Sequence, residues 1–329
     1  MRSFLKFLYH RYLDGESRWY PFLGVYYLTY QCDFRCPYCA DGANQAYYNK
    51  PQETVSGATT LQILTRMQRH CEHLVITGGE PLVHADIDAV LTGLPALRFK
   101  TVALNTNGDE VIPHLSAIAS GVDKLVFSLD TLNPAKADAW FGRGPGKLAH
   151  ILENIDAAAR YPERDYEIVI SAVATPNNIE DLYEVFTYAN ARGFVLAVCP
   201  QLQGVRPAEK LRDNDAYRRL FDFLIAQKAK GAAVFGSRLY LEHMRDFRDF
   251  CCHPFTLLTV SPNGQIHYPC LELGHPAANI LECSDLHALR MAARKTFGPP
   301  PACRSQCHSA CSLGFSLMIE QPLSVIGEW

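Results

Sequence analysis

The sequence predicts an α/β protein: a partial (β/α)6 TIM-like barrel followed by a small C-terminal domain made of a hairpin plus a helix. Two observations predict the barrel. Short apolar runs alternate with helical patterns along the chain, and six such units occur. This alternation implies βαβ units with parallel strands, and six units are too few for an eight-unit barrel. A third observation, the appearance of short strands and turns after Gly231, predicts the second domain.

The predicted elements follow in chain order. The six strands are expected at residues 23–30, 74–77, 101–105, 124–129, 167–174 and 194–199. The helices that accompany them are expected at 60–71, 86–94, 109–120, 146–160, 178–192 and 213–230. A hairpin is predicted within 253–269, since Asn263 and Gly264 both tolerate positive φ, and a helix is predicted at 285–295. We therefore expect an N-terminal helix in 1–20, the barrel in 21–235 and the C-terminal domain in 236–329.

The composition excludes several classes of protein. Of 329 residues, 48% are hydrophobic and 20% charged, which supports a sizeable core and excludes global disorder. Lys and Arg number 31 against 34 Asp and Glu, and no basic run of five occurs, so no nucleic-acid partner is expected. No apolar run approaches the ~20 residues that a spanning helix needs, and no secretory signal is evident. We therefore expect a cytoplasmic protein, although the amphipathic helix predicted at 3–13 allows peripheral membrane contact as an alternative to packing.

Twelve cysteines are the unusual feature of the composition. In a reducing compartment, clustered cysteines indicate metal binding rather than disulfides. Cys32, Cys36 and Cys39 directly follow the first strand, at the edge of a parallel sheet where ligands bind. Three thiolates on one loop suit three irons of a cubic iron–sulfur cluster and leave the fourth iron open, whereas zinc would need a further ligand nearby.

Two motifs in the first half of the chain carry a family resemblance. Cys32-Asp-Phe-Arg-Cys36-Pro-Tyr-Cys39 resembles the signature Cys-x3-Cys-x-aromatic-Cys of the radical SAM superfamily, with Tyr38 at the aromatic position. Gly78-Gly79-Glu80-Pro81 ends the second strand and looks like the stretch with which that superfamily holds the methionyl amino group of S-adenosylmethionine. Two glycines let backbone carbonyls approach a cation, and Glu80 adds a carboxylate; a simple strand-to-helix turn is the alternative.

The ends of the third and fourth strands resemble rim sequences of the same superfamily. The resemblance implies that Asn107 faces the site and that Ser128 contacts the ribose or the methionyl carboxylate. It implies that Asp130 contacts the ribose hydroxyls or the substrate. Turn and helix-cap chemistry explains the same residue types as an alternative.

The last third of the chain carries a second cysteine group around the predicted hairpin. It resembles the auxiliary-cluster modules of the superfamily, called SPASM and, in a shorter form, twitch. The resemblance implies a second 4Fe-4S cluster, with the following ligands: Cys252, Cys270, Cys303 and Cys307, for one of which Cys311, Cys251 or His308 can substitute. A zinc site of four thiolates is the alternative, since soft sulfur sites accept either. The final spacing departs from the longer pattern, which favours one auxiliary cluster over two.

The resemblance also implies a function. A 4Fe-4S cluster would cleave S-adenosylmethionine reductively, and the resulting 5′-deoxyadenosyl radical would abstract hydrogen from an unactivated carbon. The leading hypothesis is oxidative modification of a peptide or of another natural-product or metabolite precursor. The alternatives are adenosyl transfer or carbon–carbon bond formation on a lipid or isoprenoid, and a binding protein without turnover. A flavodoxin- or ferredoxin-type electron donor is implied.

Overall fold

The computed structural model describes residues 19–52, 54–304 and 307–324, together with Leu5, Leu8, Tyr9 and Tyr12. The helix predicted at 3–13 lies mostly outside these described residues. Tyr12, which is described, donates a hydrogen bond to the carbonyl oxygen of Ile319 near the C-terminal end.

Strands and helices alternate through the first two thirds of the chain and become less regular afterwards. The strands are β1 Leu23–Thr29, β2 His73–Gly78, β3 Thr101–Thr106, β4 Lys124–Ser128, β5 Glu167–Ala174, β6 Val195–Pro200, β7 Leu202–Gln203, β8 Arg206–Pro207, β9 Leu257–Val260, β10 Gln265–Tyr268 and β11 His275–Asn279. The α-helices are α2 Gly57–Gln68, α3 Ile87–Leu97, α4 Leu115–Gly121, α5 Pro134–Phe141, α6 Lys147–Arg160, α7 Asp181–Ala191, α8 Glu209–Arg212, α9 Asp215–Ala229, α10 Arg238–Asp246, α11 Leu286–Phe297 and α12 Ala310–Glu320. Short 3-10 helices are η1 Tyr47–Asn49, η2 Pro81–Val83, η3 Ile112–His114, η4 Pro254–Thr256 and η5 Pro322–Ser324.

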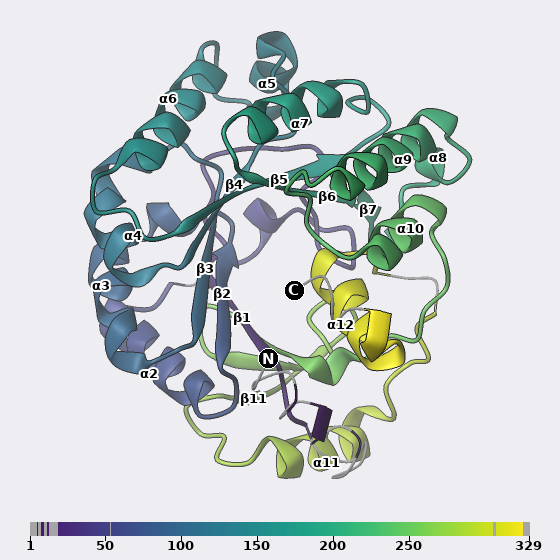
Figure 1. Ribbon diagram of the computed structural model, residues 1–329. Coiled ribbons are helices and arrows are strands. Elements are labelled where there is room, and N and C mark those ends of the chain that lie inside the picture. Colours follow the sequence, from purple (N-terminus) through teal and green to yellow (C-terminus); the bar gives the residue numbers. More distant parts are fainter. Residues whose placement is uncertain are drawn as a thin grey trace.

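The first six strands form the predicted partial barrel. They pair in parallel and in sequence order from β1 to β6. Figure 1 shows these strands curving around a centre, with the helices that connect them on the outside. Apolar side chains such as Ile76, Leu104 and Leu125 are fully buried between strands and helices, as expected for a parallel sheet covered by helices. The prediction of a partial (β/α)6 barrel is confirmed.

The hairpin after residue 235 does not stand apart from the barrel. β9 pairs in parallel with β1, and β10 and β11 follow as antiparallel neighbours, which makes one sheet of nine strands. The pattern of residues 236–329 could not reveal this pairing, because β9 and β1 meet only in the folded chain. The division at residue 235 therefore falls within a continuous sheet, and its domain boundaries stay a prediction.

The helix α12, which the sequence pattern did not predict, occupies the open side of the barrel. It contacts α10 and η4. Phe315 packs on Phe22 just before β1, and Cys199 of β6 lies close enough to Cys311 to raise the pKa of the Cys311 thiol. Figure 1 shows α12 in the gap between the first and last barrel strands. The sequence analysis also missed α5, α10 and β11.

No helix formed by the described part of the chain has the length and apolar character that crossing a membrane requires.

Candidate active site

The segment between β1 and η1 carries the first three cysteines on a loop, residues 31–39, which we call the cysteine loop. The amide of Cys39 donates to the carbonyl oxygen of Cys36 at 3.1 Å, which closes a tight turn between two of the thiols. All three thiols are partly buried. Burial raises the pKa of Cys32 to about 12, and it also raises the pKa values of Cys36 and Cys39. Electrostatic repulsion by the thiols of Cys32 and Cys39 contributes to the raised pKa of Cys36, so the three sulfur atoms lie near one another.

Residues between the cysteines anchor this loop to the barrel. Phe34 is buried and stacks on Phe141 of α5, with ring centroids 4.5 Å apart. Asp33 accepts a 2.8 Å hydrogen bond from the side-chain amide of Asn107, beyond β3. Tyr38 donates from its hydroxyl to the carboxylate of Asp130, beyond β4. Contacts with α5 and with the residues that follow β3 and β4 therefore fix the position of the loop that carries the three thiols.

The glycine turn after β2 packs directly against the entrance of the cysteine loop. Gly78 has a φ of +140°, and a Cβ atom added there would lie 2.1 Å from the carbonyl oxygen of Thr29. A Cβ atom on Gly79 would lie 2.1 Å from the carbonyl oxygen of Gln31. The amides of Gly79 and Glu80 donate to these same two oxygens, each at 2.8 Å. Glycine is thus required for contact within the chain, whatever ligand the turn also contacts.

Glu80 joins the turn after β2 to the end of β3. Its Oε1 atom accepts from the amide of Leu82 and the hydroxyl of Thr106, both at 2.9 Å. Its Oε2 atom accepts from the amide of Asn107 at 2.5 Å. Burial raises the pKa of Glu80 to about 7, and these three hydrogen bonds oppose that rise. Because Oε2 has only one donor, the carboxylate can accept a further hydrogen bond. Its role toward an ammonium group stays a prediction.

The remaining predicted contact residues differ in their surroundings. Ser128 is exposed at the carboxyl end of β4. Asp130 is buried, and its Oδ1 atom accepts from the amide of Val173 at 2.6 Å. Burial raises the pKa of Asp130 to about 7. Pro81 is buried at the start of η2. The structure thus brings all the predicted rim residues to the same end of the barrel as the cysteine loop.

Four cysteines of the second group line one cavity, which we call the thiol cavity. Its lining includes Cys252, Cys270, Cys303 and Cys307, with the carboxylate-bearing Glu272 among the other residues. The amide of Cys252 donates to the carbonyl oxygen of Cys303 at 3.1 Å, which joins two of the segments. Burial raises the pKa of Cys252 to about 12, and neighbouring Cys303 and Cys270 add to the rise. Cys307 has a φ of +56°, a strained conformation for a non-glycine residue.

The three alternative ligands are not among the residues that line the thiol cavity, although Cys251 lies close enough to Cys303 to raise its pKa. Cys311 sits in the first turn of α12 beside Cys199 and is absent from the lining of the thiol cavity, so its position does not support the prediction that it is a ligand. His308 is buried between aromatic rings, and its Nε2 atom lies 3.1 Å from the carbonyl oxygen of Arg248. Cys251 is exposed.

The donor sets fit the groups that the sequence implies. Three adjacent thiols at a barrel rim match a cubic cluster with one open iron, and four thiols around one cavity match a fully ligated cluster or zinc. Residues such as Asp33 and Phe34, which position the first set, escaped the sequence analysis. No local pattern marks them, since their partners lie more than 70 residues away.

The fold and the rim of grouped thiols define an α/β-barrel metalloenzyme. The family model described as "Radical SAM superfamily" matches residues 26–189, about half of the chain. The chain belongs to the radical SAM superfamily and is an enzyme. Membership supports a 4Fe-4S cluster and S-adenosylmethionine as cofactors.

Curated relatives share moderate sequence identity over part of their length. GTP 3′,8-cyclase of Rhizobium meliloti is 31% identical over 188 residues, which are 52% of this chain and 49% of that protein. GTP 3′,8-cyclase 1 of Pseudomonas aeruginosa is 29% identical over 222 residues, 63% of this chain and 64% of that protein. The chain therefore spans about half to two thirds of the length of these relatives.

Solved structures share the fold at low identity. SuiB of Streptococcus suis bound to S-adenosylmethionine superposes with a TM-score of 0.64 at 19% identity, covering 86% of this chain and 67% of that one. Native anSMEcpe with bound AdoMet gives 0.64 at 14% identity, covering 93% of this chain and 99% of that one. Both likenesses extend past the barrel into the C-terminal third, in agreement with a C-terminal auxiliary module.

Proposed function

We propose that Cys32, Cys36 and Cys39 hold a 4Fe-4S cluster and that the adjoining rim binds S-adenosylmethionine. The grouping of three thiols on a loop anchored at three points supports this proposal. When bound, such a cluster supplies the electron that breaks a carbon–sulfur bond of the sulfonium and leaves a 5′-deoxyadenosyl radical to abstract hydrogen.

Within this proposal, the chain's own residues hold and orient. Gly78 and Gly79 keep the end of β2 against the entrance of the cysteine loop. Asn107 and Asp130 fix that loop from β3 and β4. Ser128 would contact the ribose or the methionyl carboxylate, and its exposure at the end of β4 supports this role.

We further propose that the thiol cavity holds a second 4Fe-4S cluster and that the enzyme performs a net oxidation. The single observation that carries this proposal is the convergence of Cys252, Cys270, Cys303 and Cys307 on one cavity. Hydrogen abstraction leaves a substrate radical, and forming an unsaturated or crosslinked product requires that radical to lose one more electron. A second redox group beside the barrel provides an acceptor for this electron.

The substrate that we favour is a peptide or a related natural-product precursor. The fold likeness to SuiB, which has been solved bound to its precursor peptide SuiA, supports this class. The likeness to GTP 3′,8-cyclases favours a second candidate, the cyclisation of a purine nucleotide. A flavodoxin- or ferredoxin-type donor in a reducing cytoplasm would suit oxygen-sensitive clusters of this kind.

Cleavage of S-adenosylmethionine by Cys36→Ala protein tests the active-site assignment. Under anaerobic conditions with dithionite, the wild-type protein should release 5′-deoxyadenosine, and the variant should release none because one iron ligand is missing. Cys283→Ala, which lies outside both thiol groups, should retain cleavage. Cleavage by the Cys36 variant at the wild-type rate would refute the assignment.

Product analysis tests the proposed oxidation. Peptide substrates should lose two hydrogen atoms, a mass decrease of about 2 Da, for each 5′-deoxyadenosine released, since one hydrogen leaves with the radical and one as a proton. Turnover of GTP without peptide turnover would favour the nucleotide candidate. A product that retains the adenosyl group, with no 5′-deoxyadenosine released, would contradict both and support adenosyl transfer.

A further inference from the structure

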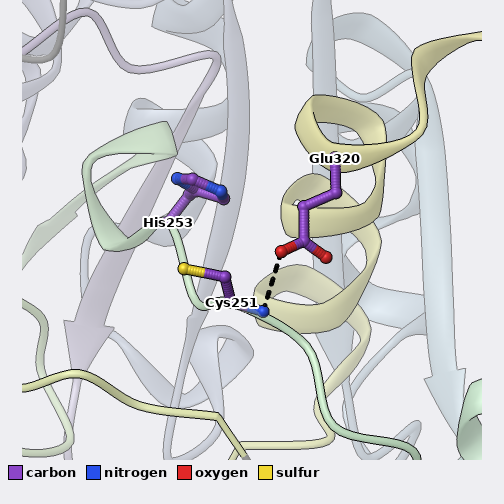
Figure 2. A group of neighbouring side chains, drawn as sticks. All are labelled: Cys251, His253 and Glu320. Carbon is purple, nitrogen blue, oxygen red and sulfur yellow. Dashed lines mark hydrogen bonds between the residues drawn. The ribbon is translucent and has the colours of Figure 1, made fainter.

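Three side chains of metal-binding type gather beside the thiol cavity but apart from its four cysteines. They are Cys251 and His253, which precede η4, and Glu320, the last residue of α12. One ligand atom from each lies within 4.8 Å of the other two. Figure 2 shows all three side chains in the space between residues 251–253 and α12. The proposed function uses none of them.

Two backbone hydrogen bonds hold residues 251 and 253 against α12. Backbone amides 251 and 253 both donate to α12, whereas the amide of Cys252 donates to Cys303 on the other side. The amides of Cys251 and His253 thus both face α12, while Cys252 and His253 both line the thiol cavity and the Cys252 thiol also bonds to Ser316 of α12.

Helix α12 matches this spacing with two residues on one face. Ser316 and Glu320 are four residues apart, which places them one above the other on a helix. The Ser316 hydroxyl oxygen accepts from the amide of His253 at 3.1 Å. The Oε1 atom of Glu320 accepts from the amide of Cys251 at 2.9 Å. These two bonds hold residues 251–253 beside α12. Among the described residues, the second carboxylate oxygen of Glu320, Oε2, has no hydrogen-bond partner.

The ligand chemistry is specific. One thiolate, one imidazole and one carboxylate are ligands that zinc accepts in tetrahedral sites, and three protein ligands leave the fourth position for water. Magnesium and calcium require oxygen ligands and would not use the thiolate. A thiolate and a carboxylate together neutralise the two positive charges of the ion.

We propose that Cys251, His253 and Glu320 form a mononuclear zinc site, separate from both iron–sulfur sites. A bound ion would clamp the segment that carries Cys252 to the end of α12. The site would thus brace one wall of the thiol cavity from the outside. His253 also lines the edge of that cavity, so the two sites adjoin.

The experiment measures zinc and iron in the anaerobically reconstituted full-length protein after incubation with zinc sulfate and removal of excess ion. The wild type should hold about one zinc per chain more than Cys251→Ser, and the two should hold equal iron. Glu320→Gln keeps an acceptor for the Cys251 amide but loses the charged ligand, so it should bind zinc at least about tenfold more weakly than the wild type. Cys252→Ser should instead lose iron and keep this zinc.

Two results would overturn the proposal. Equal zinc in the wild type and Cys251→Ser would show that Cys251 is no zinc ligand. Loss of iron in place of zinc in Cys251→Ser would make Cys251 a cluster ligand. The comparison stays decisive if the four thiols of the cavity themselves hold zinc, because the expected difference of one ion per chain between the two proteins is unchanged. Failure of the proposed function would therefore be distinguishable from failure of this site.

Discussion

The two thiol sites are assembled in different ways. Cys32, Cys36 and Cys39 lie on one short loop, so the spacing of eight residues already groups them. The thiol cavity takes Cys252 from before η4, Cys270 from after β10, and Cys303 and Cys307 from the segment before α12. The first site depends on how its loop is anchored to the barrel rim, and the second depends on the packing of three segments. Changes at the rim should therefore affect the first site alone.

The largest effect is expected from Gly79→Ala. The added Cβ atom would lie 2.1 Å from the carbonyl oxygen of Gln31, and the three nearest atoms all belong to the backbone of Tyr30 and Gln31, which has little room to adjust. We expect a loss of about 3 kcal/mol of stability and a distorted cysteine loop. Release of 5′-deoxyadenosine should disappear, and the iron of the second site should remain.

The control is Gly314→Ala in α12, where the nearest atom to an added Cβ is 4.0 Å away. That variant should be unchanged or slightly more stable, because alanine favours a helix. Full cleavage activity in the Gly79 variant would contradict the close packing described here.

A smaller effect, confined to the second site, is expected from Cys307→Ser. We expect that Cys307 is a cluster ligand and that Cys311 is not. Cys307→Ser should then lose about four of about eight irons per chain, and Cys311→Ser should lose none. Iron analysis and the visible spectrum measure this. Both variants should still cleave S-adenosylmethionine. Equal iron loss in the two variants would mean that Cys311 is a cluster ligand although it does not line the cavity.

The smallest effect is expected from Asn107→Ala. This change removes the hydrogen bond to Asp33 that ties the cysteine loop to β3, at a cost of about 1–3 kcal/mol. Thermal unfolding should register the loss, and the first site should bind its iron less firmly. Asn105→Ala is the matched control, because Asn105 lies on β3 two residues before Asn107 but bonds to Thr77 and not to the loop. Equal iron retention by the two variants would show that Asn107 does not position the cysteines.

The sequence predicted the barrel closely because its signals are local. All six predicted barrel strands agree with the structure to within one residue at each end. Apolar runs of strand length and the helical patterns between them are properties of neighbouring residues. The grouping of Cys32, Cys36 and Cys39 was equally accessible, since the loop that joins them is too short to separate them.

Long-range contacts were beyond such signals. Helix α12 carries Cys311, Ser316 and Glu320, yet nearly all of its residues are apolar or small, and no amphipathic stripe marks it. Its contacts with Phe22 before β1 and with Cys199 of β6 exist only after the barrel has formed.

By itself, the amino-acid sequence determined the parallel barrel, the cysteine loop at its rim and the family to which the chain belongs, because each rests on residues adjacent in the chain. The tertiary structure alone decided which later cysteines share a cavity, that the hairpin extends the barrel sheet, and that Cys251 and His253 meet Glu320. These outcomes depend on distances between segments that are far apart in sequence. Only packing of the complete chain sets those distances.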